Sequence, residues 1–343
     1  MRAAVLYGPK DIRLETVDIP RIRSDEILVK VKACGICGSD IHTYKTGALS
    51  TLHKPVILGH EFSGEIVEVG SAVKGLGIGD KVLGTGYRYC GECYWCQQGQ
   101  VDRCPNTALP GYGMDGAFAE YVVVPNPALE KTLFRLPEGL SWQEAATVEP
   151  MSVACFAVEQ ALIEPKEAVV VLGAGMIGQG IAQLCKARGA GKVIVSELSP
   201  KRLAMAQKLG ADVALNPKGI NPVEAVTKAT SGDMAGVVFE CSGAPIAFRQ
   251  AFLMTRVFGK VMQVGVFEQN IDLSPDLISL ITFRNMTLRG CGGQIWGMAL
   301  DAVRLGQVKT RDLITHEFAL TEAKEAFETL LNSDEAIKVM IKP

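Results

Sequence analysis

The segment 169–182, VVVLGAGMIGQGIA, contains three glycines in Gly-x-Gly-x-x-Gly spacing: Gly173, Gly175 and Gly178. A β-branched apolar run precedes them and a helical pattern follows, which is the context that this motif requires. The first glycine makes a tight turn, the second admits a pyrophosphate, and the third lets the helix pack closely on the strand. We therefore expect these residues, with Ile177 between them, to bind a dinucleotide at the amino terminus of the helix. The alternative is a purely structural glycine-rich turn.

The segments after this motif alternate between strands and helices. Three further apolar runs read as strands separated by helical patterns: KVIVSE, GVVFECSG and GKVMQVGV. This alternation predicts an α/β fold with a doubly wound, Rossmann-type parallel sheet. Glu197 ends the second strand, 19 residues after Gly178. A carboxylate there can accept hydrogen bonds from both ribose hydroxyls and repels a 2′-phosphate, which favours NAD over NADP. Arg202 either stacks on adenine or is a solvated helix charge.

The first 140 residues have a different sequence pattern, which is rich in predicted strands. Short β-branched runs punctuated by Gly and Pro predict an irregular, barrel-like β domain: EILVKVKA, GEIVEVG, DKVLGTG and FAEYVVVP. A helical pattern then covers residues 141–161, and Ser141 with Glu144 forms a plausible capping box at its start. Pro150 interrupts the pattern and is expected to kink or split the helix. The closing segments TEAKEAFETLLNS and AIKVMIKP read as a helix and a strand that return to this first domain.

Composition narrows the function classes. A chain of 343 residues with a net charge of −2 predicts two domains and offers no basic surface for nucleic acid. The amino terminus lacks the pattern of a signal peptide. No apolar run reaches the length of about 18 residues that suggests a membrane span, so we expect no membrane partner and a cytoplasmic location. In a reducing compartment the 10 cysteines read as metal ligands or buried apolar residues, and not as disulfides.

Four of these cysteines fall in the short stretch CGECYWCQQGQVDRC, at Cys90, Cys93, Cys96 and Cys104. Four thiolates complete a tetrahedral zinc site and leave no open position for a substrate. We therefore expect a structural zinc ion that staples an irregular loop.

A second set of candidate ligands is more scattered. Cys34 and Cys37 form a CxxC pair without the βαβ context of a thioredoxin-like redox motif. His60 and Glu61 follow Gly59, and a turn there would let both reach one ion. Cysteine, histidine and carboxylate together make a plausible catalytic zinc set. His53 has no motif around it and is expected to be a surface or loop histidine.

The segment Gly59-His60-Glu61-x-x-Gly64, followed by Gly70 and Val73, resembles the zinc signature of medium-chain alcohol dehydrogenases. The resemblance extends over nearly the whole chain, through ACGICGSDIH, the four-cysteine lobe, GAFAEYVVVP, GAGMIG and THEFALTEAKEAFE. The GHE form and the EPMSV stretch look most like the sorbitol, butanediol and threonine dehydrogenase branch. This resemblance implies a GroES-like catalytic domain over residues 1–152 and 294–343, an NAD-binding domain over 153–293, and a homo-oligomer, dimer or homotetramer.

The resemblance also implies site roles. Cys37 and His60 bind the catalytic zinc, Glu61 can be a third ligand, and Glu149 can bind directly or through water. Ser39 takes the proton from the substrate alcohol, and His42 passes it to solvent, a task that suits a histidine.

Each relay residue has an alternative. Ser39 can instead form a turn or cap, with His42 exposed. Asp40 can hold His60 or cap the next helix. Cys155 is expected to be a buried core residue and Cys34 a structural one.

In the nucleotide domain, the resemblance places the cofactor near Cys241-Ser242-Gly243, Val264-Gly265-Val266 and the turn at 290–293. These positions lie at the carboxyl ends of strands, where ligands of α/β proteins bind. Val264 and Val266 are alternatively plain strand core.

The substrate is less constrained. Sorbitol dehydrogenases typically have an Arg–aromatic pair where this chain has Cys291-Gly292-Gly293-Gln294, which disfavours sorbitol itself. Tyr44, Phe118 and Trp296 either shape the pocket or belong to the core. No basic cluster near the predicted pocket indicates a phosphorylated substrate, although Arg88 could contribute to binding one.

These observations together predict an enzyme with NAD and two zinc ions per chain. It would interconvert a small-molecule secondary alcohol, such as a polyol, sugar alcohol or vicinal diol, and its ketone by hydride transfer. Oxidation of a hydroxy amino acid, as by L-threonine 3-dehydrogenase, is the nearest alternative. A zinc-free quinone reductase would lack Cys37, His60 and Glu61, and a non-catalytic zinc protein would not need the nucleotide motif.

Overall fold

The computed structural model describes residues 1–47, 55–271 and 273–343, so that His53 lies outside the described residues. These residues form two compact units, Met1–Glu149 with Ile314–Pro343, and Pro150–Leu313. The sequence placed the divisions at 152/153 and 293/294. The second unit continues to Leu313 because the helix and the 3-10 turn that follow residue 293 belong to it.

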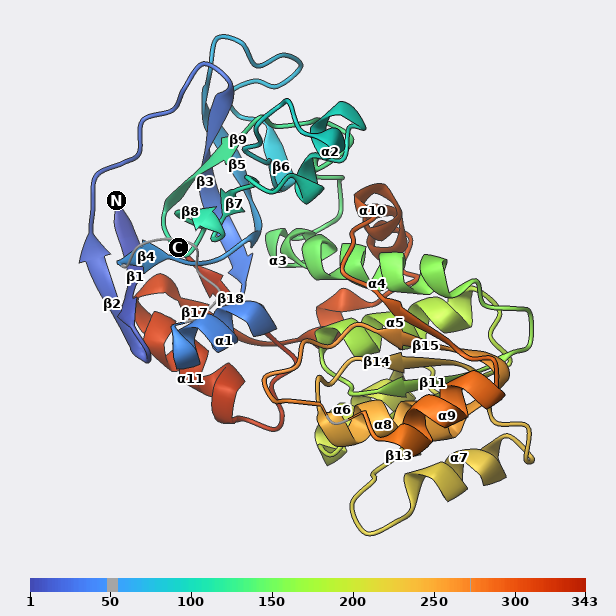
Figure 1. The fold of residues 1–343 in the computed structure, drawn as a ribbon. Coiled ribbons are helices and arrows are strands. Elements are labelled where there is room, and N and C mark those ends of the chain that lie inside the picture. The colour runs from blue at the N-terminus through green and yellow to red at the C-terminus, as the bar shows by residue number, and fades with distance from the viewer. Residues whose placement is uncertain (48–54, 272) are drawn as a thin grey trace. The chain divides into compact units, whose positions relative to one another are not determined.

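The first unit is built on β-sheets (Figure 1). Its largest sheet has seven strands in the order β10-β6-β5-β3-β18-β17, with β9 also paired to β3; β2-β1-β4 form a second sheet and β7-β8 a short pair. Their bounds are β1 Arg2–Gly8, β2 Asp11–Thr16, β3 Glu26–Gly35, β4 Val56–Ile57, β5 Glu61–Val69, β6 Lys81–Gly84, β7 Leu109–Pro110, β8 Gly113–Met114, β9 Tyr121–Pro125, β10 Leu133–Arg135, β17 Ile314–Ala319 and β18 Lys338–Lys342. The expected β-rich domain is confirmed.

The carboxyl-terminal strand β18 joins this sheet by antiparallel pairing with β3, where Met340 faces Gly35 and Ile341 faces Cys34. Both strands are almost wholly buried, because their β-branched side chains fill the core of the unit. The last residues of the chain therefore lie beside the segment that leads to Cys37.

The first unit also contains short helices: α1 Gly38–Thr46, α2 Tyr94–Gln97, α3 Trp142–Ala146 and α11 Ala323–Asn332, with 3-10 turns η1 Val101–Arg103 and η3 Leu320–Glu322. Helix α4 spans Val148–Ala161, and from Pro150 onward it belongs to the second unit. The capping box of Ser141 and Glu144 starts α3 as expected. The helical stretch splits at Thr147, and Pro150 lies in the first turn of α4, where no amide hydrogen is required. With 14 residues, α4 is the longest helix in the described ranges, and none there has the length and apolarity to cross a membrane.

The second unit is a single parallel sheet of six strands in the order β13-β12-β11-β14-β15-β16, with helices between successive strands (Figure 1). This is the 3-2-1-4-5-6 order of a dinucleotide-binding fold. Its strands are β11 Ala168–Leu172, β12 Lys192–Ser196, β13 Val213–Leu215, β14 Ala235–Glu240, β15 Thr255–Gln263 and β16 Thr287–Gly290. Its helices are α5 Met176–Ala187, α6 Pro200–Lys208, α7 Pro222–Ala229, α8 Pro245–Met254, α9 Pro275–Phe283 and α10 Trp296–Arg304, with η2 Thr310–Leu313.

Candidate active site and metal centres

Three scattered candidate ligands meet at one point of the first unit. Cys37 precedes α1 as its N-cap residue, Glu61 is the first residue of β5, and His60 directly precedes that strand. One ligand atom from each lies within 4.8 Å of the others. Cysteine sulfur, histidine nitrogen and carboxylate oxygen match the donors that zinc prefers, so the residues fit this metal.

Gly59 makes this approach possible. Its φ of +99° lies in the left-handed region, and a Cβ there would come within 2.9 Å of the Cys34 sulfur and 3.0 Å of the Phe118 amide nitrogen. Only glycine fits both requirements. The turn that precedes β5 therefore lets the adjacent His60 and Glu61 approach the same point.

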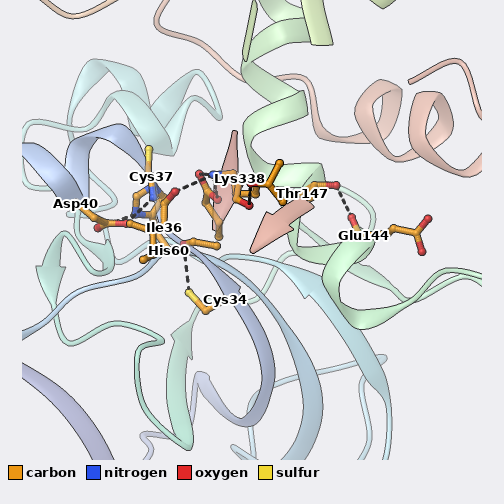
Figure 2. A network of polar contacts seen from close by, with 11 residues as sticks. Cys34, Ile36, Cys37, Asp40, His60, Glu144, Thr147 and Lys338 are labelled. Carbon is orange, nitrogen blue, oxygen red and sulfur yellow. Dashed lines mark hydrogen bonds and ion pairs between the residues drawn. The ribbon is translucent and has the colours of Figure 1, made fainter. Parts of the chain in front are cut away.

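Asp40 serves both functions considered for it. Its carboxylate accepts a hydrogen bond of 2.9 Å from the Cys37 amide and so caps α1, and it forms a buried ion pair with His60, at 3.7 Å from Nδ1 (Figure 2). Burial lowers the pKa of His60, but the negative charges of Asp40 and Cys37 outweigh burial and hold this pKa well above its usual value. A cation placed at this point would therefore have the negative charges of Asp40 and Cys37 nearby.

Glu61 has a partner that sequence reasoning missed. The Lys338 ammonium lies 2.7 Å and 3.0 Å from its two carboxylate oxygens and donates a third hydrogen bond of 2.9 Å to the Ile36 carbonyl (Figure 2). Both charged side chains are almost fully buried. Burial lowers the pKa of Lys338, but the charge of Glu61 outweighs it and raises the pKa. The available signal was a lysine directly before the apolar residues of a buried strand.

The expected relay residues lie on α1, and a second missed residue, Tyr112, lies beside them. Ser39 and His42 follow Cys37 on the first turns of this helix. The Tyr112 ring meets the His60 ring edge-on, with 4.9 Å between centroids. Burial raises the pKa of Tyr112, and the negative charges of Asp40 and Cys37 raise it further. The phenol therefore stays protonated near neutral pH, next to the hydroxyl proposed to move a proton.

Glu149 lies in the first turn of α4. It is not one of the three residues whose ligand atoms gather within 4.8 Å in the described part of the chain. Burial raises the pKa of Glu149 to about 7, and the positive charge of His60 opposes this rise. The carboxyl group is thus electrostatically coupled to the candidate centre.

The four clustered cysteines form a separate group of the first unit. Their ligand atoms all lie within 4.8 Å of one another, with sulfur separations of 3.5 Å for Cys93–Cys96 and Cys90–Cys104 and 3.9 Å for Cys90–Cys96. Zinc–sulfur bonds of about 2.3 Å in a tetrahedron imply sulfur separations of about 3.8 Å. The amides of Glu92 and Cys93 lower the pKa of Cys90 to about 7, which favours its thiolate. The lobe therefore fits a closed zinc site.

The glycine-rich turn of the second unit has the geometry that its motif predicts. Gly173 has a φ of +95°, and a Cβ on Gly178 would lie 1.9 Å from the Gly173 carbonyl oxygen. Gly175 is the N-cap of α5, and a Cβ on it would meet no atom within 4 Å. This open helix terminus fits the pyrophosphate of a dinucleotide.

The remaining candidate cofactor residues border the same sheet edge. Glu197 follows β12 and accepts hydrogen bonds from the amides of Ala174, at 2.7 Å, and Ser199, at 2.9 Å. Ile177 and Arg202 are half-buried on α5 and α6. Val264 and Val266 lie just beyond β15, and Val266 is 78% exposed, so the alternative of strand core does not apply to it.

Several open alternatives are resolved in favour of structural roles. Tyr44 and Phe118 are fully buried in the hydrophobic core of the first unit and do not line a pocket. Trp296 is buried in the second unit. Cys155 is a fully buried core residue, as expected. Arg88 forms an ion pair of 2.8 Å with Glu26, so its charge is already compensated.

Comparisons with known proteins agree with this architecture. The alcohol dehydrogenase GroES-like domain matches residues 23–138, and the zinc-binding dehydrogenase domain matches residues 177–303. A sorbitol dehydrogenase of Bacillus subtilis (strain 168) is 33% identical over 100% of this chain and 97% of its own. An L-threonine 3-dehydrogenase of Pyrococcus abyssi is 36% identical over 96% and 94%. The chain therefore belongs to the zinc-dependent medium-chain alcohol dehydrogenase family, and it is an oxidoreductase.

A solved structure extends the likeness to three dimensions. A protein of Sinorhizobium meliloti 1021, described as a zinc-binding dehydrogenase bound to NADP, is 32% identical, with a TM-score of 0.90. The match covers 100% of this chain and 99% of that one.

Proposed function

We propose that this chain is an NAD(H)-dependent dehydrogenase that interconverts a polyol, sugar alcohol or vicinal diol and its ketone at the Cys37–His60–Glu61 centre. The observation that carries this proposal is that three donors of different kinds gather at one point. Three protein ligands leave a tetrahedral metal one open position, whereas the four-cysteine lobe leaves none. Similarity to a sorbitol dehydrogenase supports a polyhydroxylated substrate.

The residues would divide the chemistry as follows. Zinc, when bound, acts as a Lewis acid that makes a substrate hydroxyl easier to deprotonate. The nicotinamide, when bound, accepts the hydride. Ser39 takes the hydroxyl proton and His42 passes it to solvent. Asp40 orients His60, and Glu149 provides a carboxyl group whose pKa of about 7 suits an exchangeable ligand or proton acceptor.

We propose NAD as the cofactor because Glu197 directly follows β12, where a carboxylate can bind the ribose hydroxyls and repel a 2′-phosphate. The Sinorhizobium relative is bound to NADP, which makes a direct comparison informative. The wild-type chain should reduce NAD⁺ with the higher kcat/KM. The Glu197→Gln variant should lose much of this preference, and a wild-type preference for NADP⁺ would refute the assignment.

We further propose two zinc ions per chain, a cytoplasmic location and a homotetrameric assembly. All 10 cysteines are free, which suits a reducing compartment. Metal analysis of the purified chain tests the zinc count, and light scattering coupled to gel filtration tests the assembly, for which a dimer is the alternative.

The substrate class is tested by NAD⁺ reduction with a panel of polyols, sugar alcohols, vicinal diols, sugar acids and L-threonine. We expect the highest kcat/KM for a compound with hydroxyls on adjacent carbons. Similarity to a threonine dehydrogenase supports the second candidate, and preference for L-threonine over every polyol and diol would favour it. Absence of NADH binding would contradict both candidate functions.

A further inference from the structure

Glu240 is the last residue of β14, and its side chain is fully buried. No ion pair joins it to a described residue. Its carboxylate instead accepts hydrogen bonds from the amides of Ser242, at 2.8 Å, and Gly243, at 3.1 Å, and from the Gln263 side-chain amide, at 2.7 Å. The Ser242 hydroxyl donates to it as well. A buried charge held only by neutral donors depends on every one of them.

The backbone of Glu240 adds two further contacts. Its carbonyl accepts hydrogen bonds from the amides of Val264, at 2.9 Å, and Gly265, at 2.8 Å. One residue thus binds both loops that follow neighbouring strands, 241–243 after β14 and 264–266 after β15. Gln263 strengthens the link, because its side-chain nitrogen donates to Glu240 and, at 2.8 Å, to the Gly265 carbonyl.

The two loops touch through their backbones. A Cβ on Gly243 would lie 2.3 Å from the Val266 carbonyl oxygen, and a Cβ on Gly265 would lie 2.3 Å from the Gly243 amide nitrogen. Such contacts admit only glycine at both positions. The loops therefore form one layer whose position is set by Glu240.

This layer lies on a defined side of the glycine-rich turn. In the sheet, β11 stands between β12 and β14. Glu197 binds the turn from the β12 side, through the Ala174 amide. Ser242 approaches it from the β14 side, because a Cβ on Gly173 would lie 3.0 Å from the Ser242 amide nitrogen. A dinucleotide spans the two halves of such a sheet, and an acid after the second strand binds the adenosine ribose. The β14–β15 half therefore receives the nicotinamide mononucleotide.

We propose that Glu240 is a positioning residue that holds loops 241–243 and 264–266 in the conformation that binds the nicotinamide half of the cofactor. The proposal rests on the proposed NAD(H)-dependent function. The two carboxylates at the strand ends then have separate roles. Glu197 binds the adenosine half of the cofactor, and Glu240 positions the loops that bind the nicotinamide half.

The substitution Glu240→Gln tests this assignment with almost no change of shape. Every partner of the carboxylate is a donor, so the new amide group must face a donor on one of its two sides. The loops should shift while the strand stays in place. Glu167→Gln is the matched control, since Glu167 is a buried carboxylate just before β11, at the opposite end of the same sheet, and is bound by Arg256 at 2.7 Å.

The experiment is calorimetric titration of the full-length wild type and both variants with NADH and, separately, with ADP-ribose, which lacks the nicotinamide. We expect Glu240→Gln to weaken NADH binding by about 10-fold and to leave ADP-ribose within about 2-fold of the wild type. Glu167→Gln should change neither. If Glu240→Gln does not fold, Gln263→Leu removes one donor from the same carboxylate and should give the same selectivity with a smaller effect.

Three results would overturn the inference. Equal weakening of NADH and ADP-ribose would show that Glu240 supports the whole sheet edge, and unchanged NADH binding would show that the loops do not depend on it. A wild-type chain that binds ADP-ribose but not NADH would also contradict it, while a wild type that binds neither would remove the proposed function together with the inference.

Discussion

The charge of Glu61 is divided between two roles. Its carboxylate lies with Cys37 and His60 at the candidate metal centre, and it is also paired with Lys338 at 2.7 Å. A carboxylate held by a buried ammonium group is a weaker metal ligand than a free one, because the same oxygens serve both cations. This geometry favours Glu61 as an exchangeable third ligand.

Removing Lys338 should be costly for stability. In the chain freed of zinc by a chelator, the Lys338→Met variant leaves Glu61 buried without a counter-charge, and breaking such a pair typically costs about 3–5 kcal/mol. Urea unfolding of the wild type and variant measures this loss. The double variant Glu61→Gln with Lys338→Met should recover much of it, and a loss below about 1 kcal/mol in the single variant would contradict a buried, uncompensated charge.

The relay assignment is tested at Ser39. The Ser39→Ala variant should lower kcat by about 100-fold, because proton transfer loses its acceptor, while the Kd for NADH stays unchanged. Ser39→Thr keeps the hydroxyl and should retain much of the activity. Stopped-flow measurement of NADH formation distinguishes the variants, and an unchanged kcat in Ser39→Ala would assign the hydroxyl to a merely structural role.

The ligand residues were predictable from sequence because Cys37, His60 and Glu61 stand in short motifs. Lys338 and Tyr112 were not. Lys338 is 277 residues from Glu61, and only the pairing of β18 with β3 brings the two together. Tyr112 reaches His60 because the turn that contains it packs on Gly59, where a Cβ on Gly111 would lie 2.9 Å from the Gly59 carbonyl oxygen. Contacts between residues so far apart in the chain leave no local sequence pattern from which they could be predicted.

Among the elements, the lobe of residues 90–104 has the least regular structure. It contains only a helix of 4 residues and a 3-10 turn of 3, neither with a buried residue. So little apolar burial does not fix a conformation, and a zinc ion bound by the four cysteines would supply the missing constraint.

Loss of one lobe cysteine should therefore make residues 90–104 more mobile without affecting the rest of the chain. We expect Cys93→Ser to contain one zinc ion fewer and to be cleaved faster between residues 90 and 104 by limited proteolysis. The zinc ion at Cys37 should remain. Zinc analysis combined with mapping of the cleavage sites checks both points, and full zinc content with unchanged proteolysis would speak against a metal-stapled lobe.

Asp212 connects helix α5 and strand β12 of the second unit through hydrogen bonds. It accepts hydrogen bonds from the Lys186 ammonium of α5, at 2.8 Å, and from the Val193 amide of β12, at 2.7 Å. Burial raises the pKa of Asp212, but Lys186 and the amide outweigh burial and lower it. A lowered folded-state pKa contributes stability above the ordinary value of 3.8, and this contribution is lost as pH falls through the folded-state value.

The Asp212→Asn variant should accordingly be less stable than the wild type by about 1 kcal/mol near neutral pH, a modest value because the pair is partly exposed. The difference should shrink as the solution is made more acidic than the ordinary pKa of a carboxyl group. Urea unfolding across this pH range measures it. Asp312→Asn, at an exposed ion pair with Lys208, is the control that should change little, and a difference independent of pH would contradict the linkage.

At this scale the sequence predicted most elements but not their boundaries. The helical stretch 141–161 was expected to break at Pro150, yet it breaks at Thr147, because a proline in the first turn of a helix is tolerated. The second unit ends at Leu313 and not at 293, because α10 carries its own apolar face, with Trp296, Ala299 and Leu300 buried. After residue 293 the sequence no longer alternates clearly between strands and helices, but this change does not coincide with the end of the second unit.

For the whole molecule, the class of fold follows from two independent patterns, a β-rich first unit closed by the carboxyl-terminal strand and a parallel sheet with a glycine-rich turn. These two patterns do not identify the substrate. The absence of the Arg–aromatic pair at residues 291–294 disfavours sorbitol, but it does not indicate which compound binds instead. Its identification depends on side chains that only the fold brings together.

The central claim is that the scattered set, and not the dense cysteine cluster, performs the chemistry. The most direct measurement is the rate of NAD⁺ reduction, with the best polyol or diol substrate, for the wild type and for Cys37→Ser, alongside the zinc content of each. We predict that Cys37→Ser retains the lobe zinc, binds NADH and forms no product above the rate without enzyme. Turnover by Cys37→Ser at the wild-type rate would show that the chemistry takes place elsewhere.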